Sequence, residues 1–299
     1  MKRSAPKSRK KKKVVAKKAS AKRRSRKKKK KAGIGKVLVK YLLLFSFFAT
    51  LGAAGYKYRN EILHYLSFKT NKYARALTKE EREAANFRVS KVVAHHKDKV
   101  FGIDVSHYQG KINWRKVKNS KQEFPIHFVF IRATAGYNKK DSQFKRNWRK
   151  TKNKGYLRGA YHYYRPDENS IAQADNFIKT VKLKKGDLPP VLDIERIPDR
   201  QSMKNLKIGL QRWLDKVEEH YGVKPILYSG QSYYTDFLKK EFKGYKLWIA
   251  SYSIFEEDIR REWRFWQFTD RGEVEGIEGD VDVNVHNGDL KRLKELLKK

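Results

Sequence analysis

The chain has 299 residues, a formal net charge of +40 and no cysteine. That length admits one large domain or two small ones, and the lack of cysteine excludes a disulfide framework, thiolate metal ligands and a cysteine nucleophile. The charge is unevenly spread, because residues 1–36 hold twenty Lys or Arg and no acidic residue. About half of the positive excess therefore lies in this short stretch.

The first 58 residues predict a tail followed by a membrane anchor. Residues 1–33 are nearly all Lys, Arg, Ser and Ala without apolar periodicity, which predicts a disordered basic tail in the cytoplasm. Residues 34–58 form an apolar stretch, long enough for one transmembrane helix if the flanking lysines reach the lipid headgroups. Basic residues before an apolar segment predict a single pass through the plasma membrane, with the rest of the chain in the periplasm or outside.

Two alternatives stay open for this region. The small residues from Ala49 to Gly55 are typical of a cleaved signal peptide, although the basic region before them is long for one. The tail alone would favour nucleic-acid binding, but beside an apolar segment it favours anionic lipid, so we do not expect a nucleic-acid partner. Residues 59–99 mix charged with scattered apolar residues and predict a helical stalk.

From Val100 onward, short apolar runs alternate with amphipathic helices. Helices are predicted from Asp141, as N-cap, to Gly155 and over residues 170–181, 202–222 and 290–297. Alternating strands and helices favour a parallel sheet with crossovers, and so an α/β fold, a modified TIM-like (β/α) barrel over residues 100–299. Strands are predicted at 100–105, 128–134, 158–164, 191–195, 225–228, 247–250, 264–268 and 280–285.

Two acidic residues end the strand at 191–195. Pro189 and Pro190 break any preceding helix, and the apolar residues that follow predict a short buried strand. Alternate residues of a strand share a face, so Asp193 and Glu195 point the same way. Two acids on one face repel each other and lose hydration, which is a poor choice for stability alone. Taken alone, such a pair is more readily explained by salt bridges to nearby lysines than by catalysis.

The barrel prediction brings further acids and aromatic rings to the same place. Catalytic residues of such barrels lie at the C-terminal ends of strands. Asp104 lies near the end of the first strand, and Asp282 lies in the last. Clustered carboxylates can also hold Ca²⁺ or Mg²⁺, but acids among aromatic rings favour a sugar polymer, and we predict neither metal nor cofactor. The aromatic candidates for substrate binding are Tyr161, Tyr163, Tyr228, Trp248, Tyr252 and Trp266.

The segments of residues 100–298 resemble, in order, those of glycoside hydrolase family 25, the lysozyme-type N-acetylmuramidases. They are GIDVSHYQG at 102–110, FVFIRAT at 128–134, FKRNW at 144–148, GAYHYY at 159–164, VLDIE at 191–195, LWIA at 247–250, WQ at 266–267 and VDVN at 281–284. The tail, anchor and stalk lie outside this resemblance. One position departs from the family pattern, because Ala135 stands where many relatives have an acid.

The resemblance implies a barrel with fewer helices than a full (β/α)₈ and a cleft for peptidoglycan glycan strands. It implies that Glu195 is the proton donor, that Asp193 assists it, and that Asp104 and Asp282 are the other acids of the cleft. Gln267 joins the aromatic residues as a candidate substrate contact. The implied reaction is hydrolysis of the β-1,4 bond between N-acetylmuramic acid and N-acetylglucosamine. We expect the protein to be a monomer.

Two questions stay open at this level. The alternative function is a peptidoglycan-binding protein that keeps the cleft without turnover. The stereochemistry is also open, since alternate strand residues are about 6.5–7 Å apart between Cα atoms and the side-chain torsions decide the carboxyl separation. The family resemblance suggests attack by the substrate's own 2-acetamido group, assisted by Asp193.

Overall fold

The chain divides into two units, residues 1–74 and 75–299. In the first unit, residues 38–53 form a helix with exposed apolar side chains that include Leu42, Phe45 and Phe48. No helix in the described part of the chain combines the length and apolar character needed to cross a membrane. The predicted basic tail, the ends of the predicted anchor and much of the predicted stalk lie outside the described residues. The computed structural model describes residues 38–53, 56, 79–118, 124–253, 256 and 258–299.

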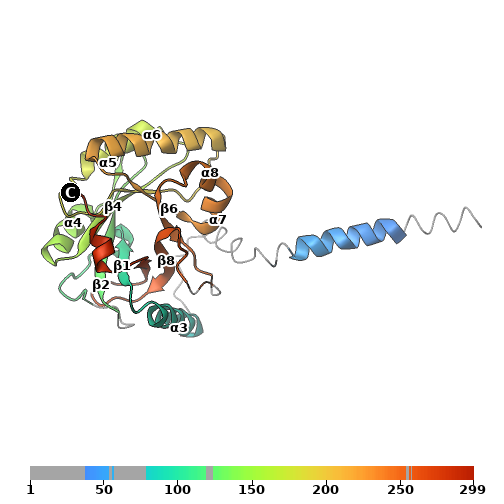
Figure 1. The fold of residues 1–299 in the computed structure, drawn as a ribbon, viewed down its shortest axis with the longest axis horizontal. Helices are drawn as coiled ribbons and strands as arrows, with labels where there is room; N and C mark the ends of the chain where they lie inside the picture. Colours follow the sequence, from blue (N-terminus) through green and yellow to red (C-terminus); the bar gives the residue numbers. More distant parts are fainter. Residues whose placement is uncertain (1–37, 54–55, 57–78, 119–123, 254–255, 257) are drawn as a thin grey trace, which may run out of the picture. The chain divides into compact units, whose positions relative to one another are not determined.

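The second unit is built on a closed barrel of eight strands (Figure 1). Hydrogen bonds join the strands in the order β1-β9-β8-β7-β6-β5-β4-β2, and β1 also pairs with β2, which closes the ring. The two-residue β3 (Lys139–Lys140) lies outside the ring and pairs antiparallel with the end of β2. The barrel strands are β1 (Val100–Val105), β2 (Ile126–Ala135), β4 (Leu157–Tyr163), β5 (Val191–Asp193), β6 (Ile226–Gly230), β7 (Lys246–Ala250), β8 (Trp263–Gly272) and β9 (Val281–His286).

One strand departs from the predicted parallel order. β9 is antiparallel to both β8 and β1, whereas every other neighbouring pair in the ring is parallel. An antiparallel strand can follow its neighbour through a short connection, whereas a parallel one needs a crossover of a dozen or more residues. Only residues 273–280 separate β8 from β9, which explains the reversal. The start of β9 therefore lies at the barrel end where the other strands finish.

The helices cover the outside of the barrel. Ser202 caps α6 by accepting from the Asn205 N–H at 3.2 Å, and Gly222 ends it in the left-handed conformation, as predicted. The prediction that Asp141 is the N-cap of the helix ending near Gly155 is wrong, because that helix, α4, starts only at Phe144. The helical segments are α3 (Lys79–His95), η2 (His107–Gln109), α4 (Phe144–Asn153), α5 (Ser170–Thr180), α6 (Met203–Tyr221), α7 (Gln231–Tyr233), η3 (Tyr234–Leu238), α8 (Lys239–Phe242) and α9 (Leu290–Lys294).

Apolar side chains fill the lower part of the barrel, beginning at its floor, the end where the parallel strands begin. Phe130 stacks on Trp248 with ring centroids 4.5 Å apart, and Phe128 and Phe265 pack edge to face beside them. Leu293 of α9 belongs to the same cluster and closes the floor. This filling occupies the lower barrel, where the buried His286 ring also packs against Phe265 with centroids 5.1 Å apart.

We expect Gly102→Ala to destabilise the barrel by about 1–3 kcal/mol or more. A Cβ at Gly102 would lie 2.5 Å from both the Phe128 ring and its backbone oxygen, and Phe128 is fully buried. Urea unfolding followed by tryptophan fluorescence measures the effect. Gly230→Ala is the matched control, since a Cβ there meets nothing within 4 Å and its φ is −65°. Equal unfolding midpoints for the two variants would contradict the close packing.

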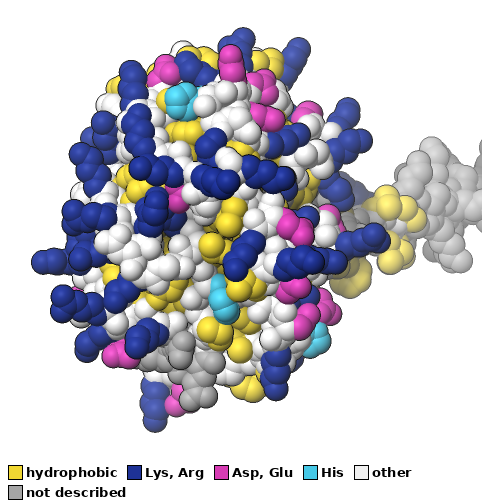
Figure 2. Space-filling view, turned by 60° about the vertical axis from the view of Figure 1, so that its left-hand side comes forward, with side chains coloured by type: hydrophobic (Ala, Val, Ile, Leu, Met, Phe, Trp, Pro, Cys, Tyr) yellow, Lys and Arg dark blue, Asp and Glu magenta, His cyan; other side chains and the backbone are white. Residues whose placement is uncertain are grey.

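The outer surface of the barrel unit is strongly basic. Figure 2 shows Lys and Arg side chains spread over one face of it, with fewer Asp and Glu among them. Exposed cations of α4 include Lys145, Arg149 and Lys150. Such a charge distribution attracts polyanionic partners over distances beyond direct contact.

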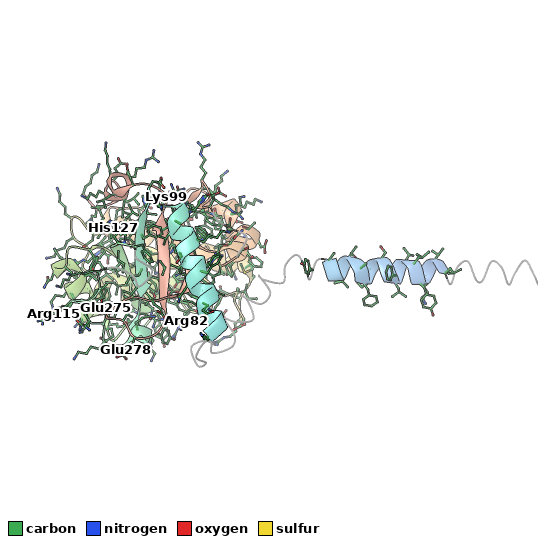
Figure 3. The ribbon with its side chains drawn as sticks, turned by 90° about the horizontal axis from the view of Figure 1, so that it is seen from below. Arg82, Lys99, Arg115, His127, Glu275 and Glu278 are labelled. Carbon is green, nitrogen blue, oxygen red and sulfur yellow. The ribbon has the colours of Figure 1, made fainter. Side chains whose placement is uncertain are left out.

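Helix α3 packs along the outside of the barrel against β8 (Figure 3). Its Val89 and Val92 are buried in the outer core, which is the apolar cluster between the barrel strands and the helices around them. Arg82 pairs with Asp280 at 2.6 Å, and Arg88 donates to the Ser253 carbonyl oxygen at 2.6 Å. The predicted stalk over residues 59–99 includes this helix, but residues 79–95 are integral to the barrel unit.

Candidate active site

The end of β5 places Asp193 and Glu195 at the barrel mouth, which is the end where the parallel strands finish. Regular pairing stops at Asp193, but the backbone stays tied to both neighbouring strands. The Tyr164 N–H donates to the Asp193 carbonyl oxygen at 2.8 Å, and the Ile194 N–H donates to the Tyr228 carbonyl oxygen at 3.1 Å. Ile194 is buried in the outer core, so the residues on either side of it face the interior. The prediction that the Asp193 and Glu195 side chains lie on the same face is confirmed.

Asp104 and Asp282 meet across the strand pair β1–β9, where their Cα atoms are register partners. Asp104 is the fifth residue of β1, whereas Asp282 is the second residue of β9. In a parallel β9, Asp282 would lie at the floor of the barrel. The reversed direction of this strand brings it to the mouth with the other acids.

A hydrogen-bond network fixes the Asp104 carboxylate. Its Oδ2 accepts from Gln267 Nε2 and from Asn284 Nδ2, both at 2.8 Å. Trp248 Nε1 donates to Asn284 Oδ1 at 2.7 Å, and Tyr228 donates its hydroxyl to Gln267 Oε1 at 2.9 Å. The Tyr252 hydroxyl donates to the same Gln267 oxygen. Each amide is thereby held in one orientation, with its NH₂ group directed at the acid.

Burial raises the pKa of three acids at the mouth, Glu195, Asp193 and Asp104. It raises the pKa of Glu195 to about 7, and the negative charge of Asp104 adds to the effect. The pKa of Asp193 also lies well above its ordinary value, through burial and the neighbouring charge of Glu195. Burial raises the pKa of Asp104 to about 6, against the stabilising donors Asn284 and Gln267. Asp193 is buried and Glu195 is half-buried. Two adjacent carboxylates withdrawn from water resist double ionisation, so the Asp193–Glu195 pair keeps a proton up to neutral pH.

One acceptor of the pair is left open. Asp193 Oδ1 is buried and has no hydrogen-bond partner among the described residues. A buried carboxylate oxygen without a donor costs free energy, and such orphaned groups call for an explanation. A donor supplied by a bound substrate would satisfy it.

A basic cluster lies beside the acids. Arg132, from the end of β2, pairs with Asp141 at 3.1 Å and lies over the Tyr108 ring, 4.9 Å from its centroid. Asp141 also accepts from the His107 backbone N–H at 2.8 Å and contacts the His107 ring. These contacts use Asp141 Oδ2, whereas its Oδ1 accepts from the Gln143 N–H at 2.9 Å in the turn before α4. The Arg132 charge lowers the pKa of both Asp193 and Glu195, opposing the effect of burial.

The predicted aromatic residues take three different places. Tyr161 and Tyr163 are half-buried at the mouth, where nearby acids and burial raise their pKa values. Tyr228 and Tyr252 hold Gln267, and Trp248 supports Asn284 from inside the barrel with 1% of its surface exposed.

Trp266 does not lie in the mouth. It is fully buried in the outer core, where its Nε1 donates to the Ser251 carbonyl oxygen at 2.9 Å. It neighbours Gln267, which faces inward, so the strand alternation turns Trp266 outward. The prediction of Trp266 as a substrate contact conflicts with this position.

Sequence reasoning missed four residues at the mouth. Asn284 carried a signal, because it alternates with Asp282 on β9 and therefore shares its face. Arg132 alternates in the same way with Phe130 on β2. Tyr108 and Asp141 both contact Arg132 from loops 33 residues apart, and no local pattern predicts these contacts.

A barrel with a close pair of acids and several tyrosines at its mouth is typical of a glycoside hydrolase. The family model for glycosyl hydrolases family 25 matches residues 103–277. The chain belongs to this family, which confirms the resemblance and the enzyme class that it implied.

Similar proteins include both uncharacterised and named members. An uncharacterised protein of Escherichia coli K12, YegX, is 42% identical over 197 residues, covering 65% of this chain and 72% of its own length. Lysozyme M1 of Streptomyces globisporus is 35% identical over 210 residues, covering 65% and 70%. Among solved structures, the bacterial lysozyme of Streptomyces coelicolor is 32% identical with a TM-score of 0.59, covering 67% of this chain and 97% of that one.

Proposed function

We propose that this protein is a lysozyme-type peptidoglycan hydrolase. It cleaves the β-1,4 bond between N-acetylmuramic acid and N-acetylglucosamine, with Glu195 as general acid and Asp193 as the assisting group. The observation that carries this proposal is the close Asp193–Glu195 pair at the barrel mouth, in which the pKa of Glu195 is raised to about 7. A carboxyl group that keeps its proton near neutral pH can protonate a leaving oxygen. The names of similar lysozymes support the substrate class.

The proposed reaction uses the two acids differently. Glu195 gives its proton to the glycosidic oxygen as the C–O bond breaks, and the leaving sugar departs as an alcohol. The carbonyl oxygen of the substrate's 2-acetamido group attacks the anomeric carbon from the opposite face. Asp193 Oδ1, which has no donor among the described residues, accepts the acetamido N–H and stabilises the developing positive charge. Water, deprotonated by Glu195, then opens the cyclic intermediate.

The remaining mouth residues have supporting parts in this proposal. Asp104 and Asp282 are polar contacts of the cleft, and Asp104 is held by Gln267 and Asn284. Tyr161 and Tyr163 offer ring faces for sugar stacking. All these residues come from one chain, so the proposed site requires no second copy.

Mass spectrometry of digested peptidoglycan tests the bond that is cut. The full-length protein is incubated with purified sacculi, and the soluble products are reduced with borohydride. Reduced muramic acid at the new ends is the expected result, and reduced glucosamine would refute the assignment of the bond. The alternative function, wall binding without turnover, predicts that the protein co-sediments with sacculi and releases no new reducing ends.

Removing the Arg132 charge should extend activity to higher pH. Activity is lost as the pH rises through the pKa of Glu195, because the general acid loses its proton. The positive charge of Arg132 lowers that pKa, so Arg132→Gln raises it and moves the alkaline limb of the profile upward. The activity ratio between pH 8 and pH 6 is expected to rise several-fold. Arg132→Lys keeps the charge and serves as control, and identical limbs in all three proteins would contradict this coupling.

We also propose that the protein is anchored in the plasma membrane, with its barrel in the periplasm or outside. The support is the exposed apolar side chains of the helix at residues 38–53 and the basic segment before it. That helix is about 24 Å long, so a complete span needs residues from its flanks. Carbonate extraction of membranes from expressing cells tests the proposal. Retention of the intact chain in the membrane is expected, whereas release of a product that begins near Gly55 would indicate a cleaved signal peptide.

A further inference from the structure

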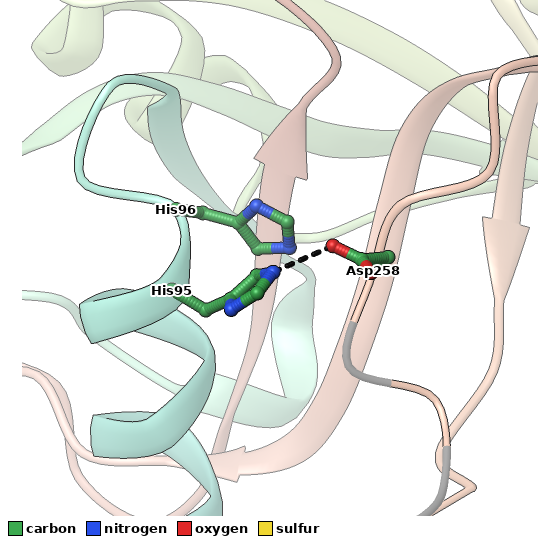
Figure 4. Close-up of side chains that lie close together, drawn as sticks. All are labelled: His95, His96 and Asp258. Carbon is green, nitrogen blue, oxygen red and sulfur yellow. Dashed lines mark hydrogen bonds and ion pairs between the residues drawn. The ribbon is translucent and has the colours of Figure 1, made fainter.

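Two histidines and an aspartate meet on the outside of the barrel, away from the mouth. His95 is the last residue of α3, His96 follows it, and Asp258 comes from the segment between β7 and β8. One ligand atom from each of them lies within 4.8 Å of the other two. Figure 4 shows both imidazole rings beside the Asp258 carboxylate, and His95 Nε2 is 2.6 Å from Asp258 Oδ1.

The backbone at each of these residues is held by buried neighbours. Val92 is buried one turn before His96, and the His96 N–H donates to the Val92 carbonyl oxygen at 3.0 Å. The His96 ring is buried and meets the Trp266 ring edge to face, with centroids 6.1 Å apart. Ile259, next to Asp258, belongs to the outer core. The three side chains are therefore presented from fixed positions, which lowers the entropy cost of binding an ion between them.

The chemistry of this set suits a divalent transition metal. Two imidazole nitrogens and a carboxylate oxygen are ligands that Zn²⁺ accepts at about 2.0–2.2 Å, with water in the fourth position. Ligand atoms around a tetrahedral ion lie about 3.3 Å apart, so shifts of about 1 Å or less would close the present separations. The carbonyl end of α3 also favours a positive charge at this place. The side chains of His95 and Asp258 are 48% and 76% exposed, which leaves a path for the ion.

We propose that His95, His96 and Asp258 form a binding site for a divalent transition-metal ion, with Zn²⁺ as the best-matched ion. The bound ion joins the end of α3 to the segment between β7 and β8. That segment includes Tyr252, whose hydroxyl donates to Gln267 at the mouth. The site thus stabilises one wall of the barrel without contacting the acids.

Calorimetric titration of the full-length, chelator-treated protein with ZnCl₂ at pH 7.5 tests the proposal. One ion per chain is expected. At a free Zn²⁺ concentration of about 100 times Kd, the thermal midpoint should rise by about 5–10 °C. Co²⁺ should give visible d–d bands of a four-coordinate nitrogen and oxygen site.

Variants of the two exposed ligands identify the site. His95→Ala and Asp258→Asn should each weaken Zn²⁺ binding by about tenfold or more and remove the rise in thermal midpoint. His220→Ala removes an exposed imidazole from α6 and should bind as the wild type does. The proposal would be overturned if binding did not saturate at Zn²⁺ concentrations up to about 100 μM. Unchanged affinity in the His95 and Asp258 variants would also overturn it, and would leave only the ion pair between them.

Discussion

Glu195→Gln is expected to lower kcat on peptidoglycan by about 10³-fold or more, with little change in KM. The amide has nearly the same shape as the protonated carboxyl group, but it cannot release a proton to the glycosidic oxygen. Because proton donation occurs only in the transition state, the loss falls on kcat rather than on binding. Release of reducing ends from sacculi measures the effect. Wild-type turnover in this variant would exclude Glu195 as the acid.

The same substitution has a stability signature that separates loss of chemistry from loss of fold. The pKa of Glu195 rises from 4.5 to about 7 on folding, so its favourable contribution is complete below pH 4.5 and is lost as the pH rises through 7. Glu195→Gln has no such pH dependence. It should equal the wild type in unfolding free energy at pH 4.5 and exceed it by up to about 3 kcal/mol at pH 8. Glu219→Gln, on the exposed face of α6, should show neither effect.

The acid pair could be predicted from sequence because its cause is local. Two prolines and three apolar residues define the strand, and strand alternation alone puts Asp193 and Glu195 on one face. The helix boundaries at Ser202 and Gly222 have equally local causes, since a hydroxyl cap and a left-handed glycine act within one turn. The barrel follows from the alternation of strands and helices over the whole domain.

The rest depended on contacts between distant parts of the chain. The antiparallel direction of β9 leaves no mark within the strand itself, yet it decides that Asp282 reaches the mouth. Asp141 has the residue type of an N-cap, but α4 begins three residues later, and the Asp141 carboxylate joins Arg132 and His107 to the turn before the helix. A strand pattern predicts both Trp266 and Gln267 for the mouth, but alternation directs only Gln267 inward and leaves Trp266 in the outer core. The sequence of α3 predicts a stalk because charged residues are mixed with scattered apolar ones.

Asp193→Asn is expected to lower kcat by about 10²–10³-fold, less than the loss at Glu195. Asparagine keeps the shape of the side chain, but it removes the charge that stabilises a positively charged cyclic intermediate. The Asp193 Oδ1 atom is buried and has no donor among the described residues, so the wild type offers it to the substrate acetamido N–H. Asp98→Asn, whose side chain is 76% exposed, is the matched control and should leave turnover unchanged.

The stereochemistry of the first product tests the role of Asp193 independently of rate. If the acetamido group attacks from below and water then attacks from above, two inversions leave the newly formed reducing end as the β-anomer. Proton NMR of a fresh hydrolysate, recorded before mutarotation, should therefore show the β-anomer first. An α-anomer would mean that water attacks directly in a single inversion, with Asp193 as the general base. Asp193→Asn would be slow under either mechanism. The anomer therefore decides whether Asp193 acts as an assisting charge or as a general base.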